Sequence, residues 1–221
     1  MGNMRTQKYR SLHKWNMQIC NGPDCDSSRT WPVLEPTTTV QEAVRAFSAG
    51  LKWEGGTFAR VGDKMTAERV WDKPERYDRT AWRQYGMIAP LYEIDRRMPM
   101  PMILWNTYRG RAIAFHWQEV GTEVITSVDW LGPDTYNLTM TGLPVGGVLA
   151  VDSTNKGAGV LRDGLVEIVR RARPETIMVF GPRRPVSDVG CDLWWERGTE
   201  VMDIGDAEAS RIFGIGISGL D

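Results

Sequence analysis

Short apolar runs alternate with longer segments of mixed polarity along most of this chain, and each kind of run predicts a different element. Apolar runs rich in β-branched residues are typical of strands that are buried on both faces. They predict five strands, near residues 57–61, 86–89, 123–128, 148–151 and 176–180, with a sixth at 200–204.

The segments between these runs have the spacing of helices. The clearest is 160–173, where Leu161 and Ile168 share one apolar stripe and charged residues face away from it. Residues 101–120 are apolar nearly all round, which predicts a heavily buried helix. Shorter helices are expected at 39–49 and 66–71.

Strands that alternate with helices at intervals of about 20 to 40 residues indicate βαβ units. The pattern predicts an α/β fold with a mostly parallel sheet of five to six strands. Because these are too few for an eight-stranded barrel, we expect an open sheet or a partial (β/α) barrel. Residues 1–38 are expected to form an irregular N-terminal arm, 39–204 a single α/β domain, and 205–221 a flexible glycine-rich tail.

The charge balance narrows the range of partners. The chain has 27 Lys and Arg against 28 Asp and Glu, a net charge of −1. Proteins that hold nucleic acid through nonspecific phosphate contacts usually show a basic excess, so nucleic acid is a partner that the net charge does not indicate. The sequence lacks an apolar run of roughly 18 residues and a signal peptide, and we expect a cytoplasmic protein without a membrane partner.

The cysteines and the known sequence motifs point to no particular cofactor. Three cysteines, an odd number, argue against a disulfide framework. Cys20 and Cys25 enclose a turn, but a structural zinc site usually needs two such pairs, so we predict no metal there. The chain carries no phosphate loop, dinucleotide fingerprint, nucleophile elbow or HExxH motif, and the cofactor therefore stays unknown at this point.

Polar and aromatic residues follow the predicted strands, at the edge where ligands bind in parallel α/β folds. They are Asp63, Tyr92, Asp129, Trp130, Asp152 and Arg183. The three aspartates are the candidate catalytic residues, because convergent carboxylates can move protons or hold a divalent ion. Tyr92, Trp130 and Arg183 are candidate substrate-binding residues. The alternative for each aspartate is structural, since aspartate after a strand also caps the following helix.

The predicted helix at 101–120 carries polar groups on an otherwise apolar face. Asn106, Arg109 and His116 share one arc of this helix. A buried arginine requires a carboxylate, several carbonyls or a ligand anion as its partner. Asn106 and Arg109 therefore join the candidate substrate-binding residues. A structural ion pair is the alternative for Arg109, and a hydrogen-bonded core position is the alternative for His116.

Four blocks of the sequence stand out together: ERVWDKPERY from Glu68 to Tyr77, the block from Ile103 to Trp130, the turn Gly142-Leu143-Pro144, and RPETIMVFG from Arg173 to Gly181. Through them the chain resembles a family of unknown function, domain of unknown function 4417. Together they span about residues 57 to 181. The Trp-Asn-x-Tyr-Arg-x-Arg to Trp-Gln stretch is the most specific part.

The resemblance implies a context rather than an activity. The family occurs in phages, integrative elements and bacteria, which implies a phage or mobile-element gene, action in the host cytoplasm and a connection with nucleic-acid metabolism. The family usually carries an acidic pair near Asp63 and Pro-Asp-Phe-Ser near Pro90. Here the corresponding residues are Gly62-Asp63 and Pro90-Leu91-Tyr92-Glu93, so one acid of the pair is absent.

Two functions are consistent with these observations. The first is an enzyme that acts on a small anionic or nucleobase-containing substrate at the carboxyl ends of the strands. The second is a noncatalytic module that binds nucleic acid or protein through exposed aromatic residues. The enzyme requires the strand-exit side chains to surround one pocket, whereas the module does not.

Overall fold

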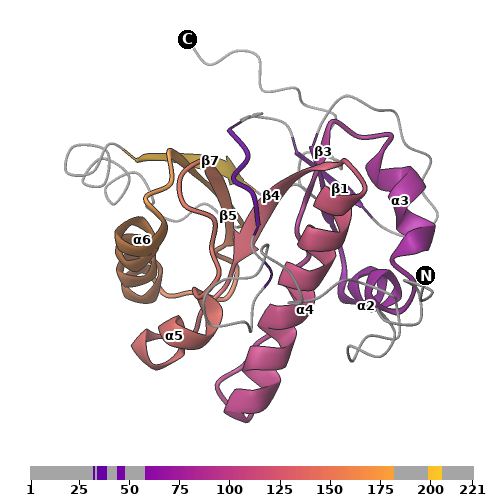
Figure 1. Ribbon diagram of the computed structural model, residues 1–221. Helices are drawn as coiled ribbons and strands as arrows, with labels where there is room; N and C mark the ends of the chain where they lie inside the picture. Colours follow the sequence, from indigo (N-terminus) through magenta and orange to yellow (C-terminus); the bar gives the residue numbers. More distant parts are fainter. Residues whose placement is uncertain (1–31, 33, 39–43, 48–57, 182–198, 206–221) are drawn as a thin grey trace, which may run out of the picture.

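All seven strands of the sheet run parallel and lie in the order in which they occur along the chain. The computed structural model describes residues 32, 34–38, 44–47, 58–181 and 199–205. The strands are β1 (Val44–Phe47), β2 (Phe58–Val61), β3 (Gly86–Ile88), β4 (Glu123–Val128), β5 (Val148–Asp152), β6 (Thr176–Phe180) and β7 (Glu200–Gly205). The sheet is open and curled like half of a barrel (Figure 1), which confirms the predicted α/β class and its parallel sheet.

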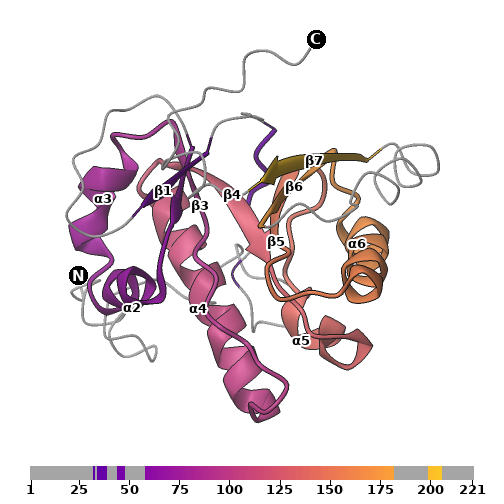
Figure 2. The same cartoon turned by 180° about the vertical axis from the view of Figure 1, so that it is seen from behind.

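The helices cover one face of this sheet. They are α2 (Lys64–Asp72), α3 (Glu75–Ala81), α4 (Met100–Glu119), the short 3-10 turn η1 (Pro133–Thr135) with α5 (Tyr136–Thr139), and α6 (Ala158–Ala172). Parallel neighbours joined by right-handed crossovers place every connecting helix on the same side. Figure 2, seen from behind, shows the strands in front of α4.

The two faces of the sheet bury separate hydrophobic cores. Between the sheet and the helices, one cluster surrounds α4 and includes Trp117, and another surrounds α6 and includes Leu165. The opposite, concave face has its own apolar cluster, formed by Phe58, Ile88, Ile125, Val148, Ala150, Met178 and Phe180. Alternate residues of each strand therefore point into the half-barrel, as in a (β/α) barrel.

The sequence-based helices are confirmed at 66–71, 101–120 and 160–173, but the helix expected at 39–49 is wrong. Val44–Phe47 forms β1 and pairs in parallel with β2, with Val44 opposite Phe58. The apolar residues here have the spacing of a helix, but pairing with the edge of the sheet stabilises a strand instead. Residues 39–43 and 48–50 lie outside the described residues, as do most of the predicted arm and the tail beyond Gly205.

The helix α3 was missing from the sequence-based prediction. Pro74 follows the end of α2 and stands at the N-cap of α3. Proline is tolerated at the start of a helix because the first N–H groups have no helical partner. Within the sheet, the sixth strand expected at 200–204 is present as β7.

A close contact between α6 and the residue after β4 fixes how the helix lies on the sheet. Trp130 is almost fully buried, and a Cβ atom at Gly164 would lie 2.0 Å from its Cε2 atom. We therefore expect Gly164→Ala to lower the free energy of unfolding by about 3 kcal/mol, because overpacking outweighs the better helix propensity of alanine. Urea denaturation measures this change.

Gly159, in the same helix, supplies the matched control. A Cβ atom there meets nothing within 4 Å, so Gly159→Ala should leave stability unchanged or raise it by up to about 1 kcal/mol. Equal effects of the two substitutions would contradict the packing described here.

Candidate functional site

A cleft opens at the carboxyl ends of the central strands. It has a volume of about 380 Å³, within the range of small-molecule sites. The residues that follow β2, β3, β4 and β5 form its walls, and inward-facing residues of the half-barrel form its floor. Its charged lining residues are Arg60, Asp63, Lys64, Glu93, Arg96, Asp129, Asp152 and Lys156.

The structure brings together five of the six residues predicted from the strand exits. Asp63, Tyr92, Asp129, Trp130 and Asp152 all line this cleft. Arg183 lies outside the described residues. Five of the predicted residues thus share one cleft, while the catalytic and binding roles of these side chains stay predictions.

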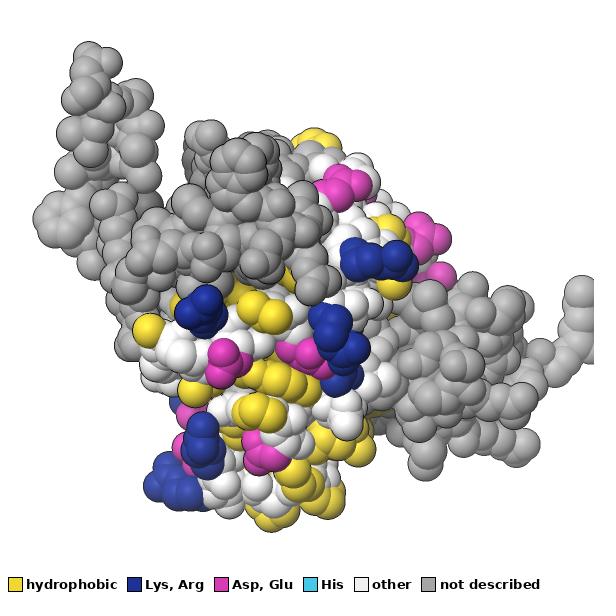
Figure 3. All heavy atoms as spheres, turned by 90° about the vertical axis from the view of Figure 1, so that its left-hand side faces the viewer, with side chains coloured by type: hydrophobic (Ala, Val, Ile, Leu, Met, Phe, Trp, Pro, Cys, Tyr) yellow, Lys and Arg dark blue, Asp and Glu magenta, His cyan; other side chains and the backbone are white. Residues whose placement is uncertain are grey.

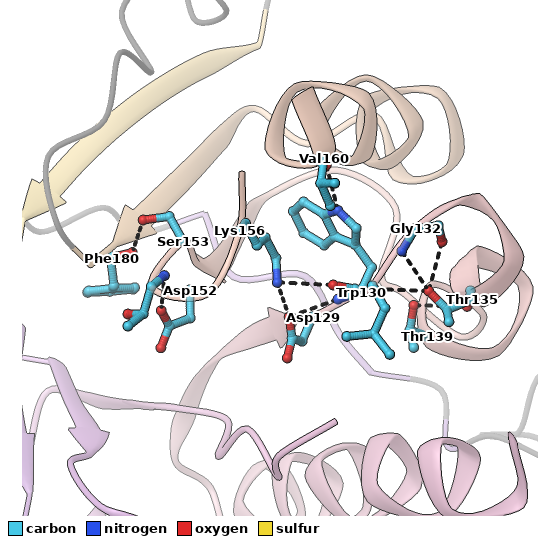
Figure 4. Close-up of polar contacts among 12 residues, drawn as sticks. Asp129, Trp130, Gly132, Thr135, Thr139, Asp152, Ser153, Lys156, Val160 and Phe180 are labelled. Atoms are coloured by element: carbon cyan, nitrogen blue, oxygen red, sulfur yellow. Dashed lines mark hydrogen bonds and ion pairs between the residues drawn. The ribbon is translucent and has the colours of Figure 1, made fainter. Parts of the chain in front are cut away.

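The central feature of the cleft is an ion pair between Asp129 and Lys156. The Nζ atom of Lys156 contacts Asp129 Oδ1 and also donates to the carbonyl oxygen of Trp130 at 3.1 Å (Figure 4). The Lys156 side chain is 6% exposed and that of Asp129 is 23% exposed. The ammonium is thus almost removed from water, whereas part of the carboxylate faces the cleft.

Burial and charge act in opposite directions on Asp129. Burial raises the pKa of its carboxyl above the ordinary value of 3.8, and the neighbouring Lys156 opposes this rise. The backbone N–H of Trp130 also donates to Asp129 Oδ1 at 2.8 Å, and Asp152 adds a negative charge nearby. A carboxyl group held in this way is suited to accept and return a proton.

Trp130 forms a wall of the cleft. Its Nε1 atom donates to the carbonyl oxygen of Val160 at 2.8 Å, and its ring lies under α6 against Gly164. The Nζ atom of Lys156 lies 4.6 Å from the ring centre, a cation–π distance. The ring therefore positions Lys156, and because Trp130 is buried, its faces are not available to stack on a ligand.

Asp63 is the N-cap of α2. Its two carboxylate oxygens accept from the backbone N–H of Thr66 at 2.8 Å and from the Thr66 hydroxyl at 2.7 Å. This is the structural alternative considered for an aspartate that follows a strand. It lies at the rim, and a proton-transfer role is better supported for Asp129.

Asp152 combines a turn contact with an inward position. Its Oδ1 atom accepts from the backbone N–H of Thr154 at 2.8 Å, closing a tight turn after β5. Its Oδ2 atom lies 4.0 Å from Arg60 Nη1 inside the half-barrel. Asp152 therefore keeps one oxygen directed toward Arg60, above the apolar floor of the cleft.

Arg109 and Asn106 lie behind the cleft wall. Arg109 donates to Glu68 Oε2 at 2.6 Å and to Asn106 Oδ1 at 2.8 Å, and its guanidinium carbon lies 3.9 Å from the ring centre of Tyr92. Asn106 donates to the carbonyl oxygen of Glu93. The predicted burial and carboxylate pairing of Arg109 are confirmed, and its partner is a protein carboxylate.

Tyr92 links this network to α2. Its hydroxyl donates to the carbonyl oxygen of Ala67 at 3.0 Å. Burial raises the pKa of Tyr92 well above its ordinary value of 10.0, although the nearby Arg109 opposes the rise. The phenol therefore stays protonated and serves as a hydrogen-bond donor that fixes the wall of the cleft.

Sequence analysis missed Arg60, Arg111 and Lys156. Arg60 lies two residues after Phe58 in β2, and residues two apart in a strand face the same side of the sheet. The inward direction of Arg60 could therefore have been predicted from the sequence. Lys156 lies in a loop that offered no periodic signal. Arg111 is 2% exposed and is held by the carbonyl oxygens of Ser127 and Thr139 at 2.6 and 3.3 Å, and burial lowers its pKa to about 9.

Neither a metal cluster nor a membrane span is found in the described part of the chain. No group of three or more His, Cys, Asp and Glu residues there could hold a metal ion. Cys20 and Cys25 lie outside the described residues. No helix among the described residues is both long and apolar enough to cross a bilayer.

The ion pair in the cleft leads to a prediction about Lys156→Met. The variant leaves Asp129 without its cation, and we expect the free energy of unfolding to fall by about 3 kcal/mol at neutral pH. Removing Lys156 raises the pKa of Asp129 further. When the pKa of a carboxyl group is higher in the folded protein than in the unfolded chain, the folded state loses stability as the pH rises from 3.8 through the pKa of the folded protein. The destabilisation by Lys156→Met should therefore be larger at pH 8 than at pH 5.

Urea denaturation across this pH range measures the effect. The double variant Asp129→Asn, Lys156→Met is the control, because it removes both charges and should abolish the pH-dependent difference. A loss of stability in Lys156→Met that does not change with pH would show that Asp129 and Lys156 are not coupled.

A second prediction concerns Arg109, which lies behind the wall of the cleft. Arg109→Met leaves Glu68 without its partner and should lower the free energy of unfolding by about 2 kcal/mol, a value kept below that of a fully buried pair because Glu68 is half exposed. Arg97→Met is the control, since Arg97 pairs with Asp95 on the open surface and its loss should leave stability unchanged. Thermal or urea unfolding compares the two variants.

Comparison with known proteins agrees with the resemblance seen in the sequence. The Gene 1 protein of Mycobacterium phage L5 is 32% identical over 170 residues, covering 72% of this chain and 73% of that protein. The Gene 1 protein of Mycobacterium phage D29 is 29% identical over 182 residues, covering 75% and 67%. No solved structure matches. The family described as domain of unknown function (DUF4417) matches residues 24–196, and the chain therefore belongs to the DUF4417 family.

Proposed function

We propose that this protein is an enzyme that acts on a small anionic or nucleobase-containing substrate in the cleft at the carboxyl ends of the strands. The observation that carries the proposal is the Asp129–Lys156 pair, an ion pair that is largely removed from water and opens onto a cavity of about 380 Å³. Ionisable groups with perturbed pKa values in a cleft are typical of catalytic sites.

Asp129 is the group that transfers a proton in this proposal. Its carboxylate is partly exposed to the cleft, and its raised pKa brings it nearer to the range in which a general base works. Lys156 holds the charged form in place through its contacts with Asp129 and with the carbonyl oxygen of Trp130. The substrate would therefore lie between this pair and the side of the cleft that carries Asp152.

The charge distribution favours a small ligand over nucleic acid. On the face shown in Figure 3, Lys and Arg side chains alternate with Asp and Glu over the described surface. In the basic cluster on α6, Glu167 accepts from both Arg170 and Arg171 at 2.6 Å, so one carboxylate offsets part of the positive charge of this cluster. A surface of this kind lacks the continuous basic field that attracts phosphate backbones.

One feature favours the noncatalytic alternative, a protein-binding module. Large apolar side chains are exposed near the start of α4, where Met100, Met102, Leu104 and Trp105 are each 40–49% exposed. Apolar groups of this kind can serve as an interaction surface. None of these four side chains is among the residues that line the cleft, so the two functions can be tested separately.

The test of catalysis is a turnover assay on a pool of candidate compounds. Purified protein is incubated with small carboxylates, phosphates, nucleobases, nucleosides and nucleotides, and their consumption is followed by mass spectrometry. We expect at least one compound to be consumed by the wild type and about 100-fold more slowly by Asp129→Asn, the loss typical of a general base.

Glu175→Gln, an exposed carboxylate outside the described cleft lining, is the matched control and should keep full activity. Consumption that is equal in the wild type and in Asp129→Asn would contradict the role given to Asp129. Consumption of no compound in the pool would count against the enzyme and in favour of the protein-binding module.

A further inference from the structure

The concave face of the sheet holds an arginine with no hydrogen-bond partner in the described part of the chain. Arg60 follows Phe58 at an alternate position of β2 and lines the floor of the cleft. Its Nη1 atom lies 4.0 Å from Asp152 Oδ2, beyond hydrogen-bond distance, and its Nε atom is buried without a partner. Its guanidinium carbon lies 5.6 Å from the ring centre of Phe180.

The other cations of the cleft are already engaged. Lys64 contacts Glu93 at 2.6 Å, Lys156 contacts Asp129, and Arg96 donates to the carbonyl oxygen of Leu131 at 2.9 Å. Arg60 therefore differs from these cations in making no hydrogen bond to the residues that the structure describes, which leaves its Nη donors for a group that enters the cleft.

The free energy needed to remove the Arg60 guanidinium from water favours a ligand as its partner. Its side chain is 22% exposed and lies above an apolar floor that includes Phe58 and Ile88. Donors placed in such surroundings lose their hydration and gain nothing unless an acceptor arrives. An apolar side chain would extend this floor without the cost, so the guanidinium fits a binding role better than a structural one.

We propose that Arg60 is the anchor of an anion subsite at the inner end of the cleft, and that the group it binds is a carboxylate. A planar guanidinium pairs with the two oxygens of a carboxylate through parallel hydrogen bonds. The inference rests on the proposed function only in its claim that the cleft takes a small molecule. It does not depend on proton transfer by Asp129.

The charge of the cleft favours a carboxylate over a phosphate. Its described lining contains four cations, Arg60, Lys64, Arg96 and Lys156, and four acids, Asp63, Glu93, Asp129 and Asp152. The lining is therefore neutral before the ligand enters. A monoanion on Arg60 is tolerated there, whereas a dianion would be repelled by Asp152, whose Oδ2 atom faces the same guanidinium.

Asp152 has a positioning role in this subsite. Its Oδ1 atom is held by the backbone N–H of Thr154, so the second oxygen is fixed in direction toward Arg60. This carboxylate keeps the guanidinium directed over the Phe180 ring while leaving its N–H donors open.

The experiment uses three aryl probes of similar size on the full-length protein: benzoate, its neutral analogue benzamide, and phenyl phosphate. Binding is measured by calorimetric titration of the wild type, Arg60→Gln and Arg60→Lys. We expect benzoate to bind the wild type more tightly than either other probe, and Arg60→Gln to weaken it about tenfold or more. Arg60→Lys keeps the charge but loses the paired geometry, and should bind benzoate with an intermediate affinity.

Arg96→Gln is the matched control, because Arg96 is a cleft arginine whose donor is already engaged, and it should bind benzoate like the wild type. Equal binding of benzoate to the wild type and both Arg60 variants would overturn the proposal, as would the absence of benzoate binding to the wild type. Tighter binding of phenyl phosphate would overturn the carboxylate assignment. If Arg60→Gln does not fold, Arg60→Lys and the benzamide comparison still decide the question.

Two outcomes separate this inference from the proposed function. Benzoate binding that requires Arg60, in a protein without turnover, would support the subsite while contradicting the enzyme. Turnover that requires Asp129 but is insensitive to Arg60 would support the enzyme while contradicting the subsite.

Discussion

The ion pair between Asp129 and Lys156 is the interaction on which the site depends. A charged lysine that is almost fully removed from water is stable only if other groups compensate its charge. Lys156 is compensated by one carboxylate, one carbonyl oxygen and the Trp130 ring. The same contacts join the end of β4 to the loop before α6. The packing of Gly164 against Trp130 then fixes α6 over this loop. The pair therefore both joins these two segments and places a carboxyl group with a raised pKa in the cleft.

The winding of the chain explains why polar groups gather on this side. Seven parallel strands in sequential order place all helices on one face and leave the other face curled inward. Apolar residues fill the inner layer of the half-barrel. The next inward-facing positions along β2, β4 and β5 are polar, namely Arg60, Ser127 and Asp152. Strand exits supply the rim. A cleft with an apolar base and a charged upper layer follows directly from this arrangement.

Much of this could be predicted from the sequence. The fold class follows from the alternation of apolar strands and helices, and the positions of Asp129 and Asp152 in the cleft follow from the rule about strand exits. Arg109 was correctly expected to be buried and paired. These features depend on local period and on the general geometry of parallel sheets, which a single sequence contains.

The remaining features depend on three-dimensional context. The partner of Asp129 is Lys156, 27 residues further along the chain in an irregular loop, and no periodic pattern connects them. The strand β1 has helical spacing and becomes a strand because β2 offers it an edge. Trp130 was a candidate substrate-binding residue, but its ring is buried under α6, where Gly164 leaves room for it. Long-range packing decides each of these cases.

The coupling between Asp129 and Lys156 is tested most directly by a pH titration of the Asp129 carboxyl carbon by nuclear magnetic resonance, with Asp129→Asn used to assign the signal. We expect the pKa of Asp129 to lie above the ordinary 3.8 in the wild type and to rise further in Lys156→Met, because burial disfavours the charged carboxylate and Lys156 favours it. A pKa at or below 3.8 in the wild type, or one that does not change when Lys156 is removed, would contradict this expectation.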